Sequence, residues 1–181
     1  MKIYLVLTAT SSLLSKTIKL YTGANYNHAS IALSSDLNDL TSFGRKDINN
    51  PFIGGFVKED ISHAFFLDAQ CSIYTCEVSP KEYAHLKREL DYYHQQQDFF
   101  RYNFLGLLAL AVNVNYKRDH AFFCSEFIAT LLEECQIYQF DKSPNLVTPQ
   151  DLQASIIFKP IYTGTIKNYL VKTHIPLYDY V

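Results

Sequence analysis

A cysteine at the start of an amphipathic helix is the feature that most restricts what this chain can form. Residues 121–134 read AFFCSEFIATLLEE, and the apolar residues after Cys124 recur at helical spacing. The pattern predicts a helix that begins at or just before Cys124 and buries one face. The first turn of a helix carries unpaired N–H groups and the positive end of the dipole. A thiol there is biased toward the reactive thiolate, and the N–H groups are suited to hold an oxyanion.

The same pattern also fits an inert Cys124. Free cysteines are among the most frequently buried residues and usually pack as small apolar side chains. A nucleophilic thiol needs a base, commonly a histidine that is distant in sequence. His28 opens a strand-like run and His120 lies four residues before the cysteine, so both are candidates. A lone histidine at a strand start is more often structural, and proximity in sequence does not decide between the two.

Strand-like and helix-like segments follow one another along the whole chain, which predicts one α+β domain over residues 1–181. Runs of apolar and β-branched residues predict strands at residues 3–7, 28–33, 40–43, 56–60 and 71–78 and a closing pair at 156–158 and 161–166. Helical spacing and capping residues predict helices at residues 13–23, 80–95, 99–111 and 124–134 and a single turn at 147–152. The second and third strands form a predicted hairpin.

Two segments have more than one interpretation. Residues 44–55 form a connection rich in Gly, Asn and Pro that is long enough for a binding or lid segment. Arg45 and Lys46 within it are either ligands for an anionic group or, more simply, solvated charges. Residues 99–111 are strongly apolar and predict a buried helix, or else the wall of a groove for an apolar ligand.

Composition narrows the class of protein. Of the 181 residues 48% are hydrophobic and 19% charged, as in a globular chain, and the net charge of −2 gives no general attraction to nucleic acid or anionic membranes. The four cysteines form no CxxC pair, so we expect no zinc site, reduced thiols and a cytoplasmic setting. We expect the apolar start to be a strand rather than a signal peptide, and no run is long enough for a transmembrane segment.

Three short motifs, taken in order, give the chain a resemblance to a known superfamily. Residues 27–33 read NHASIAL, residues 123–129 read FCSEFIA and residues 147–152 read VTPQDL. The chain resembles the permuted branch of the NlpC/P60 papain-like superfamily, which includes YiiX-like and lecithin:retinol-acyltransferase-like proteins. The resemblance extends from the first strand to the third motif. It implies a circularly permuted papain-like α+β fold, in which an antiparallel sheet or partial barrel packs against helices, including the one that bears the cysteine.

The resemblance also implies roles for individual residues. Cys124 would be the nucleophile and His28 the general base. The family usually adds an acid on the strand paired with the histidine strand, whereas Ser42 stands there in this chain. A serine can orient an imidazole but cannot stabilise an imidazolium as a carboxylate does. Three interpretations follow, in order of preference: Ser42 orients His28 weakly, Glu59 or another acid reaches the ring, or activity is impaired.

The implied function is that of a cysteine peptidase or amidase, which attacks an amide or ester carbonyl without a metal or organic cofactor. Cell-wall peptide fragments are the first expected substrates. The apolar run at residues 104–111 favours an alternative, a lipid-type acyltransferase or thioesterase. The serine in place of the acid favours a catalytically inactive ligand-binding protein, and a structural module that associates through its aromatic residues is a third possibility. The sequence does not predict an oligomeric state.

Overall fold

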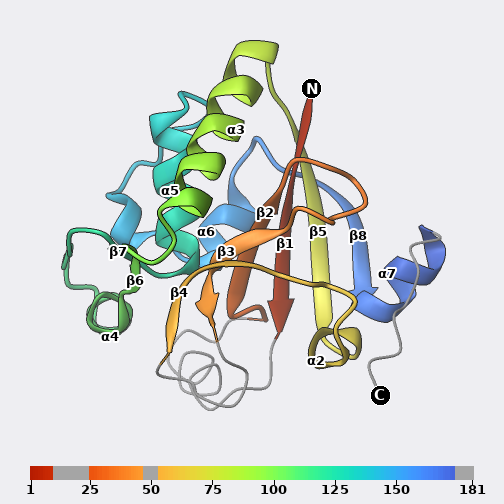
Figure 1. Ribbon diagram of the computed structural model, residues 1–181, viewed down its shortest axis with the longest axis horizontal. Helices are drawn as coiled ribbons and strands as arrows, with labels where there is room; N and C mark the ends of the chain where they lie inside the picture. The colour runs from red at the N-terminus through yellow and green to blue at the C-terminus, as the bar shows by residue number, and fades with distance from the viewer. Residues whose placement is uncertain (10–24, 47–52, 174–181) are drawn as a thin grey trace.

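The computed structural model of this chain describes residues 1–9, 25–46 and 53–173, and Figure 1 shows how they are arranged. The predicted α+β class, with an antiparallel sheet packed against helices, is confirmed. The described residues form a six-stranded sheet with the order β4-β3-β2-β1-β5-β8, in which each neighbouring pair is antiparallel. In that order the strands are β4 (Gly54–Lys58), β3 (Thr41–Arg45), β2 (His28–Ala32), β1 (Lys2–Ala9), β5 (Gln70–Glu77) and β8 (Lys159–Thr165).

Strand β1 lies in the interior of the sheet, between β2 and β5. Its side chains alternate between the two faces, so Leu5 and Leu7 belong to one core and Val6 to the other, and all three are fully buried. Burial on both faces explains why this strand reads as a nearly continuous apolar run in the sequence. The antiparallel register places Thr8 opposite His28. Strand pairing therefore fixes the position of the predicted base.

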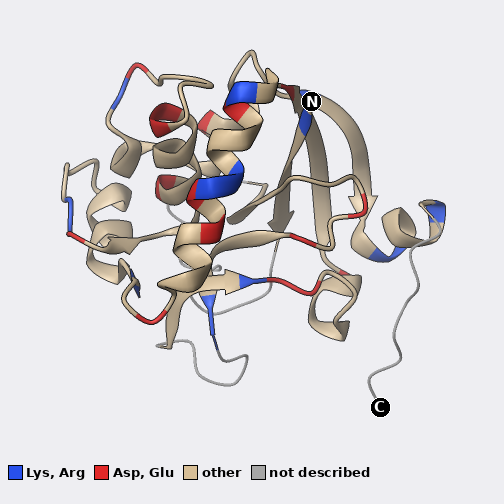
Figure 2. Ribbon diagram, turned by 45° about the horizontal axis from the view of Figure 1, so that its top comes forward, with Lys and Arg blue, Asp and Glu red and all other residues tan. Residues whose placement is uncertain are grey.

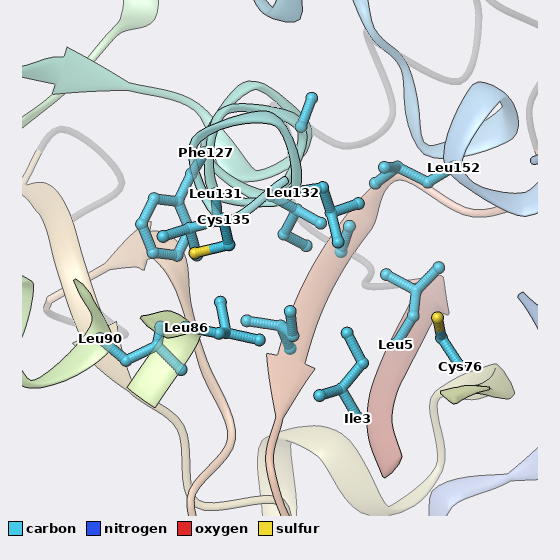
Figure 3. Packing of buried hydrophobic residues seen from close by; sticks show 14 of the residues in the cluster. Ile3, Leu5, Cys76, Leu86, Leu90, Phe127, Leu131, Leu132, Cys135 and Leu152 are labelled. Carbon is cyan, nitrogen blue, oxygen red and sulfur yellow. The ribbon is translucent and has the colours of Figure 1, made fainter. Parts of the chain in front are cut away.

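Two predicted helices, α3 (Pro80–Gln95) and α5 (Cys124–Glu134), lie on one side of the sheet (Figure 1). The larger core fills the space between them and the strands. Figure 3 shows Phe127 and Leu131 of α5 together with Leu86 of α3 and Leu5 of β1 in this core. Each fully buried side chain of this kind contributes about 1.5–3 kcal/mol. The packing holds α5, and so its first turn, in one place on the sheet.

Side-chain capping sets where α3 and α6 (Pro149–Ala154) begin. The Ser79 hydroxyl accepts a hydrogen bond from the Glu82 amide at 3.2 Å, and the Glu82 carboxylate accepts one from the Ser79 amide at 2.7 Å. Thr148 and Asp151 make the same reciprocal pair at the start of α6. Both helix starts were predicted from the sequence and are confirmed. Charged residues line the outer face of α3, as Figure 2 shows.

The other side of the sheet is covered by two short helices, α2 (Ala64–Leu67) and α7 (Ile166–Lys172), over a smaller core. The prediction of a closing pair of strands here is wrong in part. Residues 156 and 157 form a turn in which Ile156 is 88% exposed. Of the two predicted segments only the second forms a strand, β8, which pairs with β5. A run of three residues is too short to distinguish a strand from an apolar turn.

The connection predicted at residues 44–55 is shorter than expected, because the glycines at its ends belong to strands. β3 continues through Arg45, and β4 begins at Gly54. A Cβ atom on Gly54 would lie 2.9 Å from the Cβ atom of Tyr102, so the missing side chain lets a neighbouring segment approach the strand. Residues 47–52 and the helix predicted at 13–23 lie outside the described residues.

The apolar run at residues 99–111 is not the single buried helix that was predicted. It contains β6 (Arg101–Tyr102), which pairs in parallel with β7 (Ala121–Phe122), and then α4 (Phe104–Ala111). Leu105 and Leu108 are 55% and 59% exposed. The prediction of a buried helix, which was based on the hydrophobicity of this segment, is therefore wrong for these two side chains. A short 3-10 helix, η1 (Pro144–Leu146), follows α5. Across the described ranges, the helices are all too short or too polar to span a bilayer.

Candidate active site

Cys124 is the first residue of α5, as the helical pattern predicted. The preceding residue, Phe123, has an extended backbone and ends the short connection from β7. The buried face of the helix, which includes Phe127 and Ile128, packs against β2 and β3. The thiol is therefore carried on a rigid element. It is 5% exposed, and its position next to the backbone N–H groups of the first turn is the one expected for an acyl-transfer nucleophile.

His28 is the first residue of β2 and lies beside this thiol. The Cys124 side chain is within hydrogen-bonding reach of the imidazole and contributes to raising the pKa of His28. The opposite side of the ring is held by an acid, because Nε2 lies 2.6 Å from Oε1 of Glu59. A carboxylate can only accept, so Nε2 carries the proton of this bond. This arrangement leaves Nδ1 as the ring nitrogen for the thiol.

Glu59 follows β4 directly and receives three side-chain contacts at its carboxylate. Besides the imidazole, the Ser42 hydroxyl donates to Oε1 at 2.7 Å and the Ser30 hydroxyl donates to Oε2 at 2.5 Å. The backbone amide of Glu59 donates to the Leu40 carbonyl at 2.7 Å, which anchors the residue to the start of β3. Its side chain is 7% exposed. A buried carboxylate with this many donors is held in a single orientation.

Ser42 was expected first of all to orient the His28 ring, but its hydrogen-bond partner is another residue. Its hydroxyl donates to Glu59, and the acid makes the contact with the imidazole. The order of preference between Ser42 and Glu59 is therefore reversed. The reason lies in strand pairing. Ser42 is opposite Val57 in the β3–β4 register, so the chain two residues beyond Val57 brings an acid to the space next to the serine.

The pKa values of the pair shift in opposite directions. Burial opposes the charge on His28, but the Glu59 carboxylate and the contact with Cys124 raise its pKa well above the ordinary value of 6.5. Burial likewise opposes the charge on Glu59, but His28 and the two serine hydroxyls lower its pKa below 4.5. Both shifts favour an imidazolium next to a carboxylate.

Tyr102 is a further side chain at this site, and the sequence reasoning missed it. It belongs to β6, whose pairing with β7 brings it close to the start of α5. Burial raises the pKa of the Tyr102 hydroxyl well above 10, and the charges of Cys124, Arg45 and Glu126 also act on it. A two-residue strand has too little periodicity to be recognised, so the sequence offered no signal for this residue.

The other candidates from the sequence have other partners. The ring of His120 lies 4.3 Å from that of Phe99, on an exposed segment, whereas the contact with the thiol comes from His28. Arg45 lies over the ring of Phe65 at 5.9 Å, and Lys46 donates to the Gln97 carbonyl at 3.1 Å. Neither cation is simply solvated.

The three other cysteines are free and buried. Burial raises the pKa of the Cys71 and Cys135 thiols to about 12 and raises that of Cys76 as well. These thiols stay protonated at neutral pH, so their environments differ from that of Cys124, which has an imidazole next to it.

Two comparisons with known proteins do not assign this chain to a family. Neither the models of known protein families nor the curated protein sequences contain a match to this chain.

Proposed function

We propose that this protein is a cysteine hydrolase, a peptidase or amidase of the permuted papain-like type. The observation that supports this most is the contact between the Cys124 thiol, on the first turn of α5, and the imidazole of His28. The far side of the ring is held by Glu59 at 2.6 Å. A nucleophile, a base and a group that orients the base are the three parts that covalent acyl transfer requires.

The proposed fold assignment rests on the order of these parts along the chain. The histidine opens β2 and the cysteine opens α5, so the base precedes the nucleophile in sequence. The permuted papain-like branch has this order. An antiparallel sheet with the cysteine helix packed on β2 and β3 is compatible with it.

In the proposed reaction the Cys124 thiolate attacks the carbonyl carbon of an amide. A C–S bond forms, the carbonyl π-electrons move to oxygen, and N–H groups of the first turn of α5 stabilise the oxyanion. When this intermediate collapses, the C–N bond breaks and the His28 imidazolium gives its proton to the leaving amine. His28 then takes a proton from water, which attacks the thioester. The C–S bond breaks, the carboxylic acid leaves, and the thiol–imidazole pair is restored.

Glu59 has a defined part in this proposal. Its charge stabilises the imidazolium, and its hydrogen bond fixes the ring so that the other nitrogen faces the sulfur. The hypothesis of an inactive ligand-binding protein was based on the serine at position 42, where the family usually has an acid. Because the Glu59 carboxylate contacts the ring, that argument no longer favours it.

A second candidate, hydrolysis or transfer of a lipid-type acyl group, is favoured by the surface of α4. Leu105, Leu108 and Val112 follow one another at helical spacing, and all are more than half exposed. This helix starts two residues after Tyr102 in the chain. An acyl chain is one ligand that such a stripe would bind.

Alkylation with iodoacetamide near neutral pH, followed by peptide mapping of all four cysteines, tests the proposal. We expect Cys124 to react first and a His28→Ala variant to lose most of this preference. Turnover of a panel of peptide amides and of short- and long-chain esters, with Cys124→Ser as the inactive control, then separates the two candidates. Equal alkylation of Cys124 and the other three cysteines would rule out the nucleophile.

A Leu108→Gln variant isolates the second candidate. If acyl chains bind along α4, this variant raises KM for long-chain esters and leaves short-chain esters and peptide amides unaffected. An equal KM for long chains in both proteins contradicts the lipid candidate and leaves the amidase proposal intact.

A further inference from the structure

A buried acid lies in the first turn of the helix that carries Cys124, two residues after the cysteine. Glu126 is 3% exposed, although most glutamates lie at the surface. Its Oε2 atom accepts hydrogen bonds from the Phe123 amide at 3.2 Å and from Nδ2 of Asn103 at 3.3 Å. Phe123 has no polar side chain with which to cap α5, so the carboxyl group satisfies an N–H that the helix itself leaves unpaired.

Asn103 extends this contact to two more elements. It is fully buried, and its Oδ1 accepts a hydrogen bond from the Gly106 amide at 2.9 Å, which caps α4. Its backbone amide donates to the Phe122 carbonyl at 2.9 Å. A Cβ atom on Gly106 would lie 2.2 Å from Asn103 Nδ2, so only glycine fits there. One asparagine thus joins the starts of α4 and α5 to the end of β7.

Asn103 and Phe123, the two hydrogen-bond partners of Glu126, are each adjacent in the chain to a residue of the candidate site. Tyr102 precedes Asn103, and Cys124 follows Phe123. In Figure 1, β6 and β7 lie next to each other between α4 and α5, where these residues meet. A shift of Asn103 relative to Phe123 would therefore move the tyrosine relative to the thiol.

We propose that Glu126 is a positioning residue, whose buried carboxyl group ties Tyr102 to Cys124 through the Phe123 amide and the Asn103 side chain. The inference rests on the proposed function, since it concerns the reactivity of Cys124. Glu126 touches neither reacting atom in this scheme. It acts through the relative placement of two segments that pair in parallel over two residues.

The protonation of this acid makes the proposal measurable. Burial raises the pKa of Glu126 to about 7, even though the Phe123 amide, the Asn103 side chain and the charge of Lys117 lower it. Lys117 acts on its carboxylate electrostatically, and the Tyr102 hydroxyl lies close enough for its own pKa to be raised by Glu126. Hydrogen bonds to an ionised carboxylate are roughly twice as strong as those to a neutral group. The tie between Tyr102 and Cys124 therefore tightens as the pH rises through neutrality.

The test is the rate constant for alkylation of Cys124 between pH 5.5 and 8.5 in the wild type and in Glu126→Gln. The glutamine oxygen still accepts from Phe123 and Asn103 but cannot ionise. We expect the ratio of the two rate constants to change by about tenfold across this range, with a midpoint near pH 7. Glu82→Gln is the matched control, because Glu82 holds the same capping position on α3 and is partly exposed. Its profile should follow the wild type.

Asn103→Ser provides a second variant in case glutamine disturbs the fold. Serine can still cap α4 but is too short to reach Glu126. Because the proposed tie runs through the hydrogen bond from Asn103 to Glu126, its loss should largely remove the pH-dependent change in the alkylation rate that distinguishes the wild type from Glu126→Gln. Parallel profiles for wild type and Glu126→Gln, or an undiminished pH-dependent change in Asn103→Ser, overturn the role of Glu126 alone. Slow alkylation of wild-type Cys124 at every pH overturns the proposed function instead.

Discussion

Replacing Glu59 with glutamine tests how much the charge next to His28 contributes to reactivity. Glutamine has nearly the same shape, and its oxygen can still accept from Nε2, while its NH2 group can donate to the Ser30 hydroxyl, which now accepts. The 2.6 Å contact and the ring orientation are therefore retained and the negative charge is lost. The experiment changes electrostatics with little change in geometry.

The magnitude follows from the hydrogen bond to the ring. A hydrogen bond to a charged group contributes about 1.5–3 kcal/mol and a neutral one about 0.5–1.5 kcal/mol, so the bond to the imidazolium weakens by about 1–2 kcal/mol. That loss corresponds to a decrease of about 5- to 30-fold in kcat/KM or in the rate of Cys124 alkylation at pH 7. Without the carboxylate, burial lowers the pKa of His28, so the imidazolium disappears at a lower pH than in the wild type.

Alkylation kinetics give the rate, and NMR titration of the His28 ring gives the protonation state. Ser42→Ala is the matched control, because it removes one neutral donor to Glu59 and keeps the charge. We expect it to lower the rate by less than about fivefold. A Glu59→Gln variant within twofold of the wild type, with an unchanged His28 titration, would refute the idea that this carboxylate supports the base.

Two further perturbations concern stability. The pKa of Glu126 rises from 4.5 to about 7 on folding, so the folded state binds more protons than the unfolded state between these values and loses stability as the pH rises through them. Urea unfolding should show Glu126→Gln gaining about 3 kcal/mol relative to the wild type between pH 4.5 and 8; a constant difference would contradict the raised pKa. Gly106→Ala forces a methyl group against the buried Asn103 side chain and should cost about 1–3 kcal/mol by the same measurement. A loss below about 0.5 kcal/mol would mean that Asn103 moves aside freely.

The parts of the structure that the sequence predicted are those with strong local patterns. The first strand is apolar along its length because both of its faces are covered, and α3 and α6 carry reciprocal caps that can be read from four residues. The start of α5 at Cys124 followed from the spacing of the apolar residues after it. In each case a local physical rule and the tertiary structure agree.

The parts that could not be predicted depend on contacts between distant segments. Glu59 reaches His28 because β3 and β4 pair in a particular register, which the sequence around either residue does not encode. Tyr102 comes to the site through a two-residue parallel pairing. Leu108 is exposed although its neighbours are apolar, because α4 contacts the rest of the protein through its other face. Periodicity describes a segment, whereas these positions are set by its partners.

The interior location of β1 has a consequence for synthesis on the ribosome. This strand is made before both of its neighbours, and one of them, β5, ends only at Glu77. Until that stretch has left the exit tunnel, β1 exposes an apolar strand with an unpaired edge, the kind of surface that promotes association between nascent chains. The sheet must therefore assemble around its earliest strand after most of its partners have emerged, which favours slow, late completion of the fold over stepwise growth from one end.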